Sequence, residues 1–424
     1  MRFNSLDDWL AWQEGLHPSE IYLGLDRVRA VYERLGVALN CPVITVAGTN
    51  GKGSCVAMLA AIYRAAGYRT GVYTSPHLLR YNERVCMNDE EVTHQALCEA
   101  FERVDRARTD LAGVTTSLTY FEFGTLAALD LFGRATLDVV ILEVGLGGRL
   151  DAVNIIDADV ALIATIAIDH VAWLGNSREA IGREKAGIMR PDRPVVCGDL
   201  NPPQSIVAVA LECGATLYLN GRDFGAKPQL TQWRWWGGQR QRDALPMPAL
   251  RGSFQLNNAA SVLMVAELLM ARLPLSQSHV REGLANVKVA GRFEVIGGEV
   301  PLVLDVAHNP ESAQALADTL KGWSMPGRIY AVVAMMADKD ISGALRPLLE
   351  VVDEWHITAI DMARSATVSQ MQQQLQALGV TAIRTEPSVA VALEKLRQVV
   401  QPHDRIVIFG SFYTVAEAMR VVHV

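Results

Sequence analysis

A glycine-rich loop with a single lysine follows an apolar run near the beginning of the chain. The run at 43–47 is rich in β-branched residues and leads into Gly48-Thr-Asn-Gly-Lys-Gly-Ser54. Glycines let backbone N–H groups approach an anion closely, and the lysine adds a positive charge. A helix predicted over 54–66 would direct its N-terminus, which favours negative charge, at the same place. The loop therefore predicts a site for nucleotide phosphates.

The lysine of this loop lacks the spacing of the general P-loop. Lys52 stands four residues after Gly48 rather than five, and Gly53 separates it from Ser54. This spacing disfavours an ordinary kinase or G-protein. The structural alternative is a tight strand-to-helix turn with a solvated lysine, and the residue types favour the phosphate site over that turn.

Polar residues follow three other predicted strands. Ser75, Glu143 and His170 each stand where an apolar run ends. Ligands collect beyond the carboxyl ends of the strands in open α/β sheets, so we expect these residues to join the loop at one rim. Ser75 and Glu143 offer the oxygen ligands that Mg²⁺ prefers, whereas imidazole suits softer metals. Taken singly, Glu143 could be a buried helix cap, Ser75 a turn residue before Pro76, and His170 a core histidine.

Composition limits the class of protein. The chain has 424 residues, 50% of them hydrophobic, which predicts at least two domains. A net charge of -7 disfavours nucleic-acid binding. We expect no membrane span and no signal or transit peptide. The six cysteines are scattered without a C-x-x-C pair, which indicates reduced thiols in a cytoplasmic protein and no zinc site.

Short apolar strands alternate with helical patterns along most of the chain. This pattern predicts an α/β fold: a P-loop ATPase-type domain with a mainly parallel sheet at 1–293, followed by a smaller Rossmann-like α/β domain at 294–424. The predicted strands are 43–47, 70–74, 138–142 and 160–167 in the first domain, and 301–305, 329–335, 355–360 and 405–409 in the second. The predicted helices include 120–132, 258–272, 311–321 and 388–400.

Two segments suggest functions that we do not assign. The segment 226–252 combines tryptophans and arginines around a Gly-Gly turn, which could stack on bases, but the acidic chain favours a half-buried hairpin without chemistry. The segment 145–151 resembles a dinucleotide motif, but Leu150 replaces its third glycine. Its glycines are better explained by close approach of a ligand around Glu143.

Six motifs together resemble the signatures of the folylpolyglutamate synthase family, which belongs to the Mur ligase superfamily. They span nearly the whole chain in the family's order, and they are most similar to the bifunctional bacterial dihydrofolate synthase/folylpolyglutamate synthases. The motifs lie at 47–54, 73–78, 118–122, 142–151, 183–188 and 305–310.

The resemblance implies an ATP-dependent ligase that adds L-glutamate to dihydropteroate, giving dihydrofolate, and to tetrahydrofolate, giving folylpolyglutamates. The substrate carboxylate would first become an acyl phosphate. The resemblance also implies Mg²⁺ and a monovalent cation. No hydrophobic seam in the sequence demands a partner, so we expect a monomer. The alternatives are a monofunctional folylpolyglutamate synthase, a Mur-type amino-acid ligase, and a nucleotide-binding regulatory module without ligase chemistry. The motif at 118–122 and the two-domain length favour folate over a Mur substrate.

The resemblance also assigns residues to four roles. Lys52, Lys185, Arg292 and His308 are expected to be catalytic, and Ser411 is expected to bind substrate, in catalysis or glutamate handling. Ser75, Glu143, His170 and an N6-carboxylated Lys185 are expected at the metal. The ATP contacts implied are Thr49, Asn50, Gly51, Lys52, Gly53, Ser54, Asn258, Arg292 and Asp305. The other substrate contacts implied are Glu20, Ile21, Tyr22, Thr119, Tyr120, Phe121, Glu122, Leu150, Asp151 and Ala152.

Some of these residues have plain structural interpretations when taken alone. Lys185 would be a surface residue near a helix C-terminus, and only the resemblance makes it a modified metal ligand. Asn258 would cap a helix, Arg292 would form a linker salt bridge and Asp305 would sit in a turn. Tyr22 departs from the family, because bifunctional members have Asp at this position.

Overall fold

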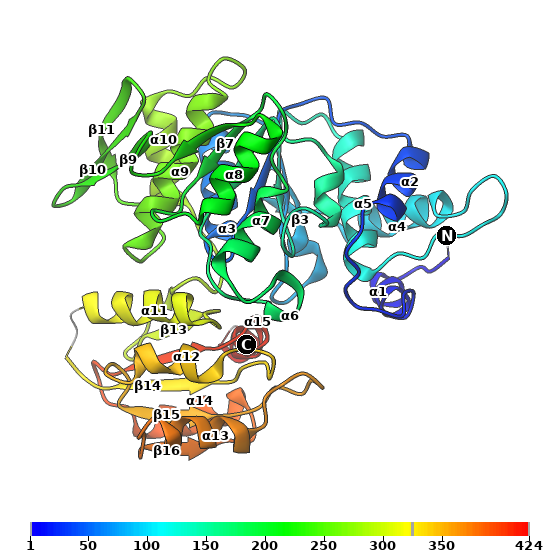
Figure 1. The fold of residues 1–424 in the computed structure, drawn as a ribbon. Helices are drawn as coiled ribbons and strands as arrows, with labels where there is room; N and C mark the ends of the chain where they lie inside the picture. Colours follow the sequence, from blue (N-terminus) through cyan, green and yellow to red (C-terminus); the bar gives the residue numbers. More distant parts are fainter. Residues whose placement is uncertain (1, 324–325, 423–424) are drawn as a thin grey trace. The chain divides into compact units, whose positions relative to one another are not determined.

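The computed structural model describes residues 2–323 and 326–422, and it divides the chain into two compact units (Figure 1). Unit 1 comprises residues 1–167, 171–248 and 257–287, and unit 2 comprises 168–170, 249–256 and 288–424. The α/β fold class is confirmed. The division at residue 293 stays a prediction.

Unit 1 is built on a mainly parallel sheet, which has eight strands among the described residues, in the order β4-β3-β2-β5-β1-β6-β7-β8. The strands from β2 to β8 in this order run parallel, and β3 and β4 form an antiparallel edge. The strands are β1 Val43–Ala47, β2 Thr70–Tyr73, β3 Val85–Met87, β4 Glu90–Glu91, β5 Val139–Glu143, β6 Val160–Ile163, β7 Pro194–Cys197 and β8 Thr216–Leu219.

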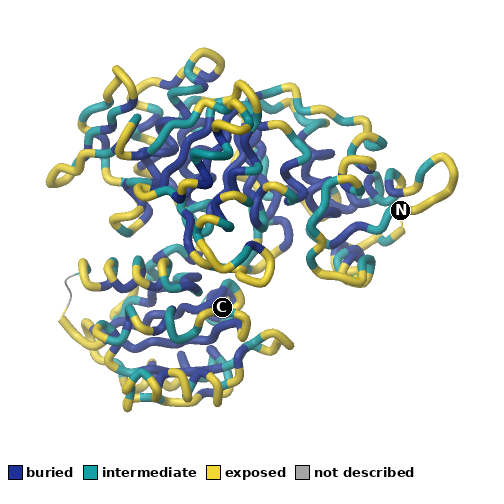
Figure 2. Tube along the Cα trace, viewed as in Figure 1, coloured by how far each residue is buried: buried dark blue, intermediate teal, exposed yellow. Residues whose placement is uncertain are grey.

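Helices connect and cover these strands, and the central strands β1, β5 and β6 are buried along their full length (Figure 2). Strands buried on both faces are typical of a parallel sheet covered by helices. The helical elements are α1 Leu6–Glu14, α2 Asp26–Leu35, α3 Lys52–Ala65, η1 Tyr81–Arg84, α4 His94–Ala107, α5 Tyr120–Arg134, η2 Ala152–Ile155, α6 Val171–Leu174, α7 Arg178–Ala186 and α8 Gln204–Cys213.

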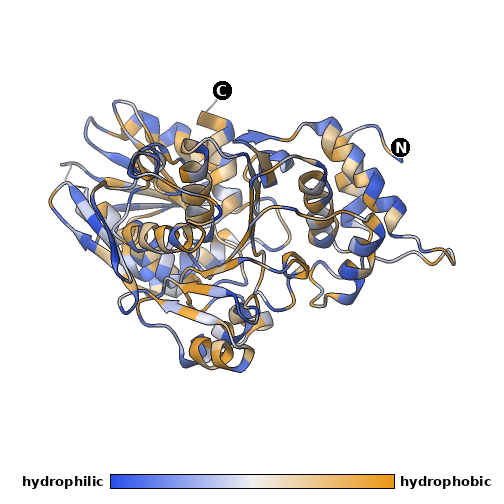
Figure 3. Cartoon of the chain, turned by 90° about the horizontal axis from the view of Figure 1, so that it is seen from above, coloured by the Kyte–Doolittle hydropathy of each residue, from blue (hydrophilic) through white to orange (hydrophobic). Residues whose placement is uncertain are grey.

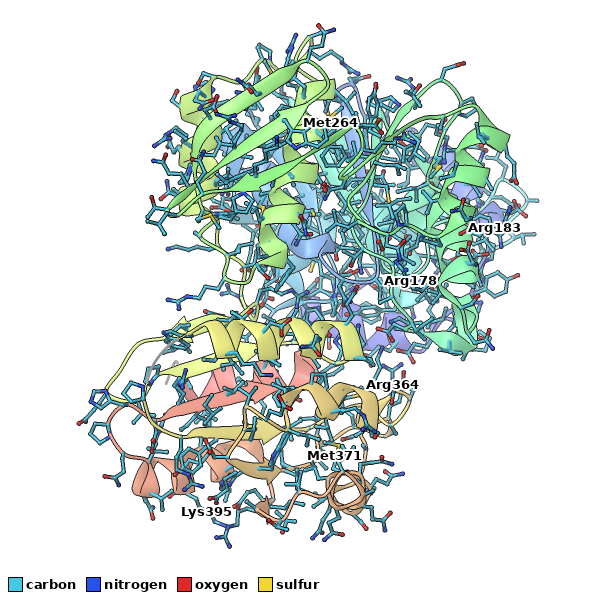
Figure 4. All side chains as sticks on the ribbon, turned by 60° about the vertical axis from the view of Figure 1, so that its left-hand side comes forward. Arg178, Arg183, Met264, Arg364, Met371 and Lys395 are labelled. Atoms are coloured by element: carbon cyan, nitrogen blue, oxygen red, sulfur yellow. The ribbon has the colours of Figure 1, made fainter. Side chains whose placement is uncertain are left out.

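The aromatic hairpin is a sheet of its own with three strands, β9 Phe224–Pro228, β10 Gln232–Gly237 and β11 Arg240–Pro246. Trp235 is fully buried, and its indole N–H donates to the carbonyl of Ala260 at 3.0 Å. Ala260 lies in α9 (Phe254–Leu268), as does Met264, which approaches Gly237 of the hairpin (Figure 4). Helix α10 (Gln277–Asn286) packs on α3. The half-buried hairpin is confirmed, with one strand more than predicted.

Unit 2 contains a smaller sheet, which has six strands within the described residues, in the order β12-β13-β17-β14-β15-β16. All neighbours are parallel except β12 and β13. Helices of the protein carry both hydrophobic and hydrophilic residues along their length (Figure 3). The strands are β12 Glu294–Ile296, β13 Leu302–Asp305, β14 Ile329–Val333, β15 Glu354–Ile357, β16 Ile383–Thr385 and β17 Arg405–Phe409. The helices are α11 Pro310–Gly322, α12 Ile341–Leu345, η3 Arg346–Leu348, α13 Val368–Ala377, α14 Val389–Val399 and α15 Phe412–Val422.

Several predicted boundaries differ from the structure. The strand expected over 160–167 ends at Ile163, because the next residues leave the sheet and bond the loop after β1. The helix expected from Ser54 begins at Lys52, and the helix expected from Asn258 begins at Phe254. Strands β7 and β8 were not predicted. No helix in the described part of the chain is long and apolar enough to cross a membrane.

Candidate active site

The loop after β1 is held by the segment that follows β6. The backbone N–H of Thr49 donates to the carbonyl of Thr165 at 2.7 Å. The Thr49 hydroxyl donates to the Ala167 carbonyl at 3.1 Å and accepts from the Ala167 N–H at 3.0 Å. The Thr165 hydroxyl donates to the carbonyl of Asn50 at 3.2 Å. These bonds fix the shape of the loop.

Lys52 is the first residue of α3, and its side chain folds back over the loop. The ammonium donates to the carbonyls of Gly48 at 3.1 Å and Thr49 at 3.4 Å. Its positive charge is therefore held beside the helix N-terminus, where a phosphate would be stabilised by both. Gly51, at φ 86°, precedes the helix without a side-chain cap. Gly53 and Ser54 complete its first turn, and Ser54 is buried.

Asn258 lies directly against this loop, inside α9 rather than at its cap. A Cβ at Gly51 would stand 2.9 Å from the Asn258 Oδ1 atom and 3.3 Å from the Ala164 Cβ atom. Gly51 is thus required twice, by its positive φ and by this close approach. The structure brings the loop residues and Asn258 together in unit 1. Their role in holding ATP stays a prediction.

Glu143 is the last residue of β5, and its carboxylate faces the segment after β2. The side chain is buried, and one carboxylate oxygen lies 3.4 Å from the backbone N–H of Ser75, which donates to it. Glu143 ends a strand and does not cap a helix. A buried carboxylate beside a hydroxyl-bearing residue fits Mg²⁺, which binds one or two protein oxygens and keeps waters and phosphates as its other ligands.

Lys185 lies in the last turn of α7 and is buried, with 3% of its surface exposed. The surface position that residue type and helix position favour is therefore wrong. The end of α7 packs on the glycine segment after β5, where a Cβ at Gly148 would stand 2.9 Å from the Lys185 carbonyl oxygen. A buried lysine favours its neutral amine, which is the form that reacts with carbon dioxide.

His170 is not a core histidine, because 40% of its side-chain surface is exposed. It has a positive φ of 51° and belongs to unit 2, whereas Ser75, Glu143 and Lys185 belong to unit 1. Within the described residues, no three His, Cys, Asp or Glu side chains form a ready metal cage. The metal role of His170 stays a prediction.

The motif at the start of α5 forms a helix cap and an ion pair. Thr119 and Glu122 make a reciprocal capping box, in which the Thr119 N–H donates to Glu122 at 2.7 Å and the Glu122 N–H donates to the Thr119 hydroxyl at 3.2 Å. Arg27 donates to both oxygens of the buried Glu122 carboxylate, at 2.8 and 3.0 Å. Sequence reasoning missed Arg27, whose spacing from Glu122 gives no signal.

The segment at 20–22 reaches the same arginine. The guanidinium of Arg27 lies 3.8 Å from the ring centre of Tyr22, which is half-exposed, and His17 accepts a hydrogen bond from Arg27 at 2.6 Å. Glu20 and Ile21 precede this stack. The structure thus brings the 20–22 segment and the motif at the start of α5 together through Arg27. Their contact with a pterin stays a prediction.

Tyr120 and Phe121 begin α5 and point into different surroundings. Phe121 packs on Tyr73, with ring centres 6.1 Å apart, and a Cβ at Gly145 would stand 2.6 Å from its ring. Tyr120 makes an edge contact with Tyr81 at 5.7 Å. Gly145 therefore makes room for the Phe121 ring of this protein. The sequence had indicated the close approach of a ligand here.

Asp151 is a buried carboxylate in the segment that packs on Phe121. Burial raises its pKa to about 6, against hydrogen bonds from the backbone N–H groups of Leu146 and Val153 at 2.8 and 3.0 Å. The charge of Lys52 also lowers it, so the carboxylate and the loop lysine influence each other. Leu150 and Ala152 flank it, and Asp151 caps η2.

In unit 2, Arg292 stands just before β12, and Asp305 is the last residue of β13. The Asp305 carboxylate accepts the N–H groups of Phe293 and Ala307, both at 2.8 Å. Burial raises its pKa, and the Arg292 charge opposes the rise. The Arg292 guanidinium lies 4.9 Å from the Phe412 ring centre. Asp305 is thus a turn-stabilising acid, and its contact with ATP stays a prediction.

Asp169 gathers charged groups that sequence reasoning did not connect. Its carboxylate accepts from Lys339 at 2.5 Å and from the Asn309 amide at 3.3 Å, and the His308 Nε2 atom lies 3.4 Å away. Burial alone would raise the pKa of Asp169, but the bond from His308 and the charges of His170 and Lys339 hold it well below its usual range. Lys339 follows β14, and this strand-end position was its only sequence signal.

Ser411 is buried at the start of α15. Its hydroxyl shares a hydrogen bond with the Thr414 hydroxyl at 2.7 Å and accepts from the Thr414 N–H at 3.0 Å. Thr414 in turn donates to the Ala334 carbonyl after β14. These bonds are those of a helix N-terminus, and the part of Ser411 in substrate handling stays a prediction.

Comparison with known proteins places this geometry in context. Residues 291–412 match the family described as Mur ligase, glutamate ligase domain. The chain is 43% identical to the dihydrofolate synthase/folylpolyglutamate synthase of Escherichia coli K12, over 98% of this chain and 95% of that protein. It is 38% identical to the protein of the same name from Haemophilus influenzae, over 98% and 97%.

Two solved structures are similar over nearly their full length. One is described as E. coli FolC in complex with DHPP and ADP, with a TM-score of 0.93 at 43% identity, covering 99% of this chain and 98% of that chain. The other is a bifunctional folylpolyglutamate synthase/dihydrofolate synthase with Mn, AMPPNP and L-glutamate bound, with a TM-score of 0.91 at 44% identity and the same coverage.

Proposed function

The chain belongs to the dihydrofolate synthase/folylpolyglutamate synthase family, and we propose that it catalyses the ATP-dependent joining of L-glutamate to dihydropteroate and to tetrahydrofolate. The observation that carries the proposal is the loop at 48–54, where Lys52 is held over the N-terminus of α3, while the neighbouring strand β5 ends at the buried Glu143 carboxylate. The relatives solved with DHPP, ADP, AMPPNP and L-glutamate support these substrates.

The reaction needs ATP because a free carboxylate has no leaving group. A carboxylate oxygen of the folate substrate attacks the γ-phosphorus of ATP, the bond to the β,γ-bridging oxygen breaks, and an acyl phosphate and ADP result. The glutamate amine then attacks the acyl carbon, loses a proton and expels inorganic phosphate, leaving an amide. Lys52 and the first N–H groups of α3 stabilise negative charge on the transferring phosphoryl group.

The residues divide by the part of the reaction that they serve. Mg²⁺, when bound, neutralises and orients the phosphates; Glu143 and Ser75 would hold it, with His170 and Lys185. The relative solved with Mn and AMPPNP supports a divalent ion. We assign ATP to Thr49, Asn50, Gly51, Lys52, Gly53, Ser54, Asn258, Arg292 and Asp305. We assign the pteroyl substrate and glutamate to Glu20, Ile21, Tyr22, Thr119, Tyr120, Phe121, Glu122, Leu150, Asp151, Ala152, His308 and Ser411.

Lys185 is proposed to carry an N6-carboxylate, formed when its neutral amine attacks carbon dioxide and loses a proton. The burial of this lysine supports the proposal, since burial favours the neutral amine over the ammonium. Intact-protein and peptide mass spectrometry under carbon dioxide, together with a crystal structure, should show the added carboxylate. An unmodified amine in both would refute the modification and leave the ligase function standing.

The decisive assay supplies ATP, labelled glutamate and one acceptor at a time. Dihydropteroate and tetrahydrofolate should each give a glutamylated product, and a Mur nucleotide should give none. If no glutamylated pterin forms, the proposal is refuted. If product forms from tetrahydrofolate alone, the protein is a monofunctional folylpolyglutamate synthase. We further propose that the protein is a cytoplasmic monomer with domains at 1–293 and 294–424, and that it uses a monovalent cation. Light scattering tests the monomer. Assays with and without K⁺ test the cation.

A further inference from the structure

Arg84 is a buried cation beside the predicted substrate segments. The assignments above give it no role. It ends η1 and has 9% of its surface exposed. Its carbonyl accepts the N–H of Thr74 at 2.9 Å, so its backbone is tied to the residue before Ser75. Arg84 therefore stands where the rim that carries Ser75 and Glu143 continues towards the start of α5.

The guanidinium of Arg84 is surrounded by rings. It lies 5.3 Å from the ring centre of Tyr81 and 5.5 Å from that of Tyr120, and its Nε atom donates to the His77 Nδ1 atom at 2.8 Å. Burial and the Arg84 charge lower the pKa of His77 to about 4, so the ring is neutral near pH 7 and accepts this bond. The charge of Arg84 also opposes the rise that burial causes in the pKa of Tyr73.

No acidic side chain in residues 2–323 and 326–422 forms an ion pair with Arg84. Three other buried or half-buried arginines of unit 1 do have such partners: Arg27 pairs with Glu122, Arg103 with Asp130 and Arg108 with Asp105. The half-buried Arg34 instead donates to two backbone carbonyls and the Thr116 hydroxyl. The neighbouring Glu83 is engaged by the backbone N–H groups at 78–80. Burying a charged group without an opposite charge is costly, and the rings and the neutral imidazole offset only part of that cost.

We propose that Arg84 binds the carboxylate of dihydropteroate and positions it for reaction. The inference rests on the proposed function, because it takes the pteroyl acid as the substrate. A planar guanidinium matches a carboxylate through paired hydrogen bonds. Tyr120, in contact with Arg84, belongs to the segment assigned to the pterin, and Ser75 leads to the residues assigned to the phosphates. A carboxylate held at Arg84 would thus join the two halves of the site.

The test measures binding, by calorimetry with ADP present, of dihydropteroate and of its neutral carboxamide to wild type and Arg84→Gln. Wild type should bind the acid about 10- to 100-fold more tightly than the amide, as a hydrogen-bonded charge pair predicts. Arg84→Gln should bind both alike, and its affinity for the amide should stay within about threefold of wild type. Equal loss of acid and amide, or an unchanged preference for the acid, would overturn the proposal.

Three controls make this binding test specific to Arg84. Arg103→Gln removes a half-buried arginine that already has a carboxylate partner, and it should leave the preference for the acid intact. If Arg84→Gln does not fold, Arg84→Lys replaces it and should retain a reduced preference for the acid. A rise in the KM for glutamate with unchanged dihydropteroate binding would assign Arg84 to glutamate and refute the proposal. Because binding is read without turnover, a wild type that binds the acid but forms no product would defeat the proposed function alone.

Discussion

Both units place charged side chains just beyond the carboxyl ends of parallel strands, and they use those charges in different ways. In unit 1, the ammonium of Lys52 bonds the neutral carbonyls of Gly48 and Thr49. In unit 2, the ammonium of Lys339 bonds the carboxylate of Asp169 directly, and Asn309 and His308 approach the same carboxylate. The carbonyls that Lys52 bonds belong to the loop itself, whereas the carboxylate that Lys339 bonds forms an ion pair with it.

The two arrangements suit the two lysine charges to different roles. A cation that lies over a loop at a helix N-terminus can act on an incoming phosphate together with the N–H groups of the helix. A cation in a buried ion pair mainly orders its neighbours, and removing its partner destabilises the fold. We therefore expect Lys52 to control turnover and Asp169 to control the stability of unit 2.

The largest expected effect comes from Lys52→Ala. Glutamylation should fall by at least about 1,000-fold, since a charge acting on the transferring phosphoryl group is lost. Dihydropteroate binding, measured by calorimetry, should stay within about threefold of wild type, because the loop acts on phosphate and not on the pterin. Equal loss of binding and turnover would remove the contrast between the two units.

Asp169→Asn is the matching change in unit 2. It leaves Lys339, whose side chain is 10% exposed, without its carboxylate, which should cost about 3 kcal/mol. Hydrogen exchange should report faster opening of β14 and β17, while β1 and β5 of unit 1 keep wild-type protection. Uniform protection in both units would show that this ion pair is not structural.

The pH dependence of stability tests Asp151. Its pKa of about 6 lies above the ordinary 3.8, so the folded state holds a proton that the unfolded state has released between these values. Stability from this group is present below pH 3.8 and is lost as pH rises through 6, by about 3 kcal/mol. His77 has the opposite sign, since its pKa of about 4 removes stability as pH falls below 6.5. Urea unfolding at several pH values gives the unfolding free energy of wild type and of Asp151→Asn, and their difference isolates the contribution of Asp151. If the two free energies change with pH in parallel, burial does not raise the pKa of Asp151.

The smallest effect is expected on the hairpin. Arg240 has 65% of its side-chain surface exposed and pairs with Glu267 at the surface. Arg240→Ala should change kcat/KM by less than about twofold and stability by less than about 1 kcal/mol, as surface pairs usually do. A strong loss of activity would give this hairpin a part in the chemistry that neither unit's strand-end charges explain.

Local patterns in the sequence predicted what depends on neighbouring residues. The glycines and Lys52 predicted the loop, and the apolar runs predicted the central strands, because burial on both faces leaves a continuous apolar signature. The early end of β6 was not predictable, because the sequence at 164–167 looks like a continuing strand. In the structure these residues leave the sheet, and two of them bond Thr49 of the loop. No local pattern indicated that Lys185 is buried or that Arg27 pairs with Glu122, because both depend on packing between distant segments.

The hydrogen bonds of Thr49 also bear on the order in which the protein is made. Its hydroxyl exchanges bonds with Ala167 across 118 residues of sequence, and Gly51 packs on Asn258 still further along. A chain emerging from the ribosome therefore has the glycines of the loop long before it has the partners that shape them. Nascent chains that end before residue 165 should not form the finished loop, and those that end before residue 258 should form it without its last support. The loop proposed to bind ATP would therefore reach its final shape late in synthesis.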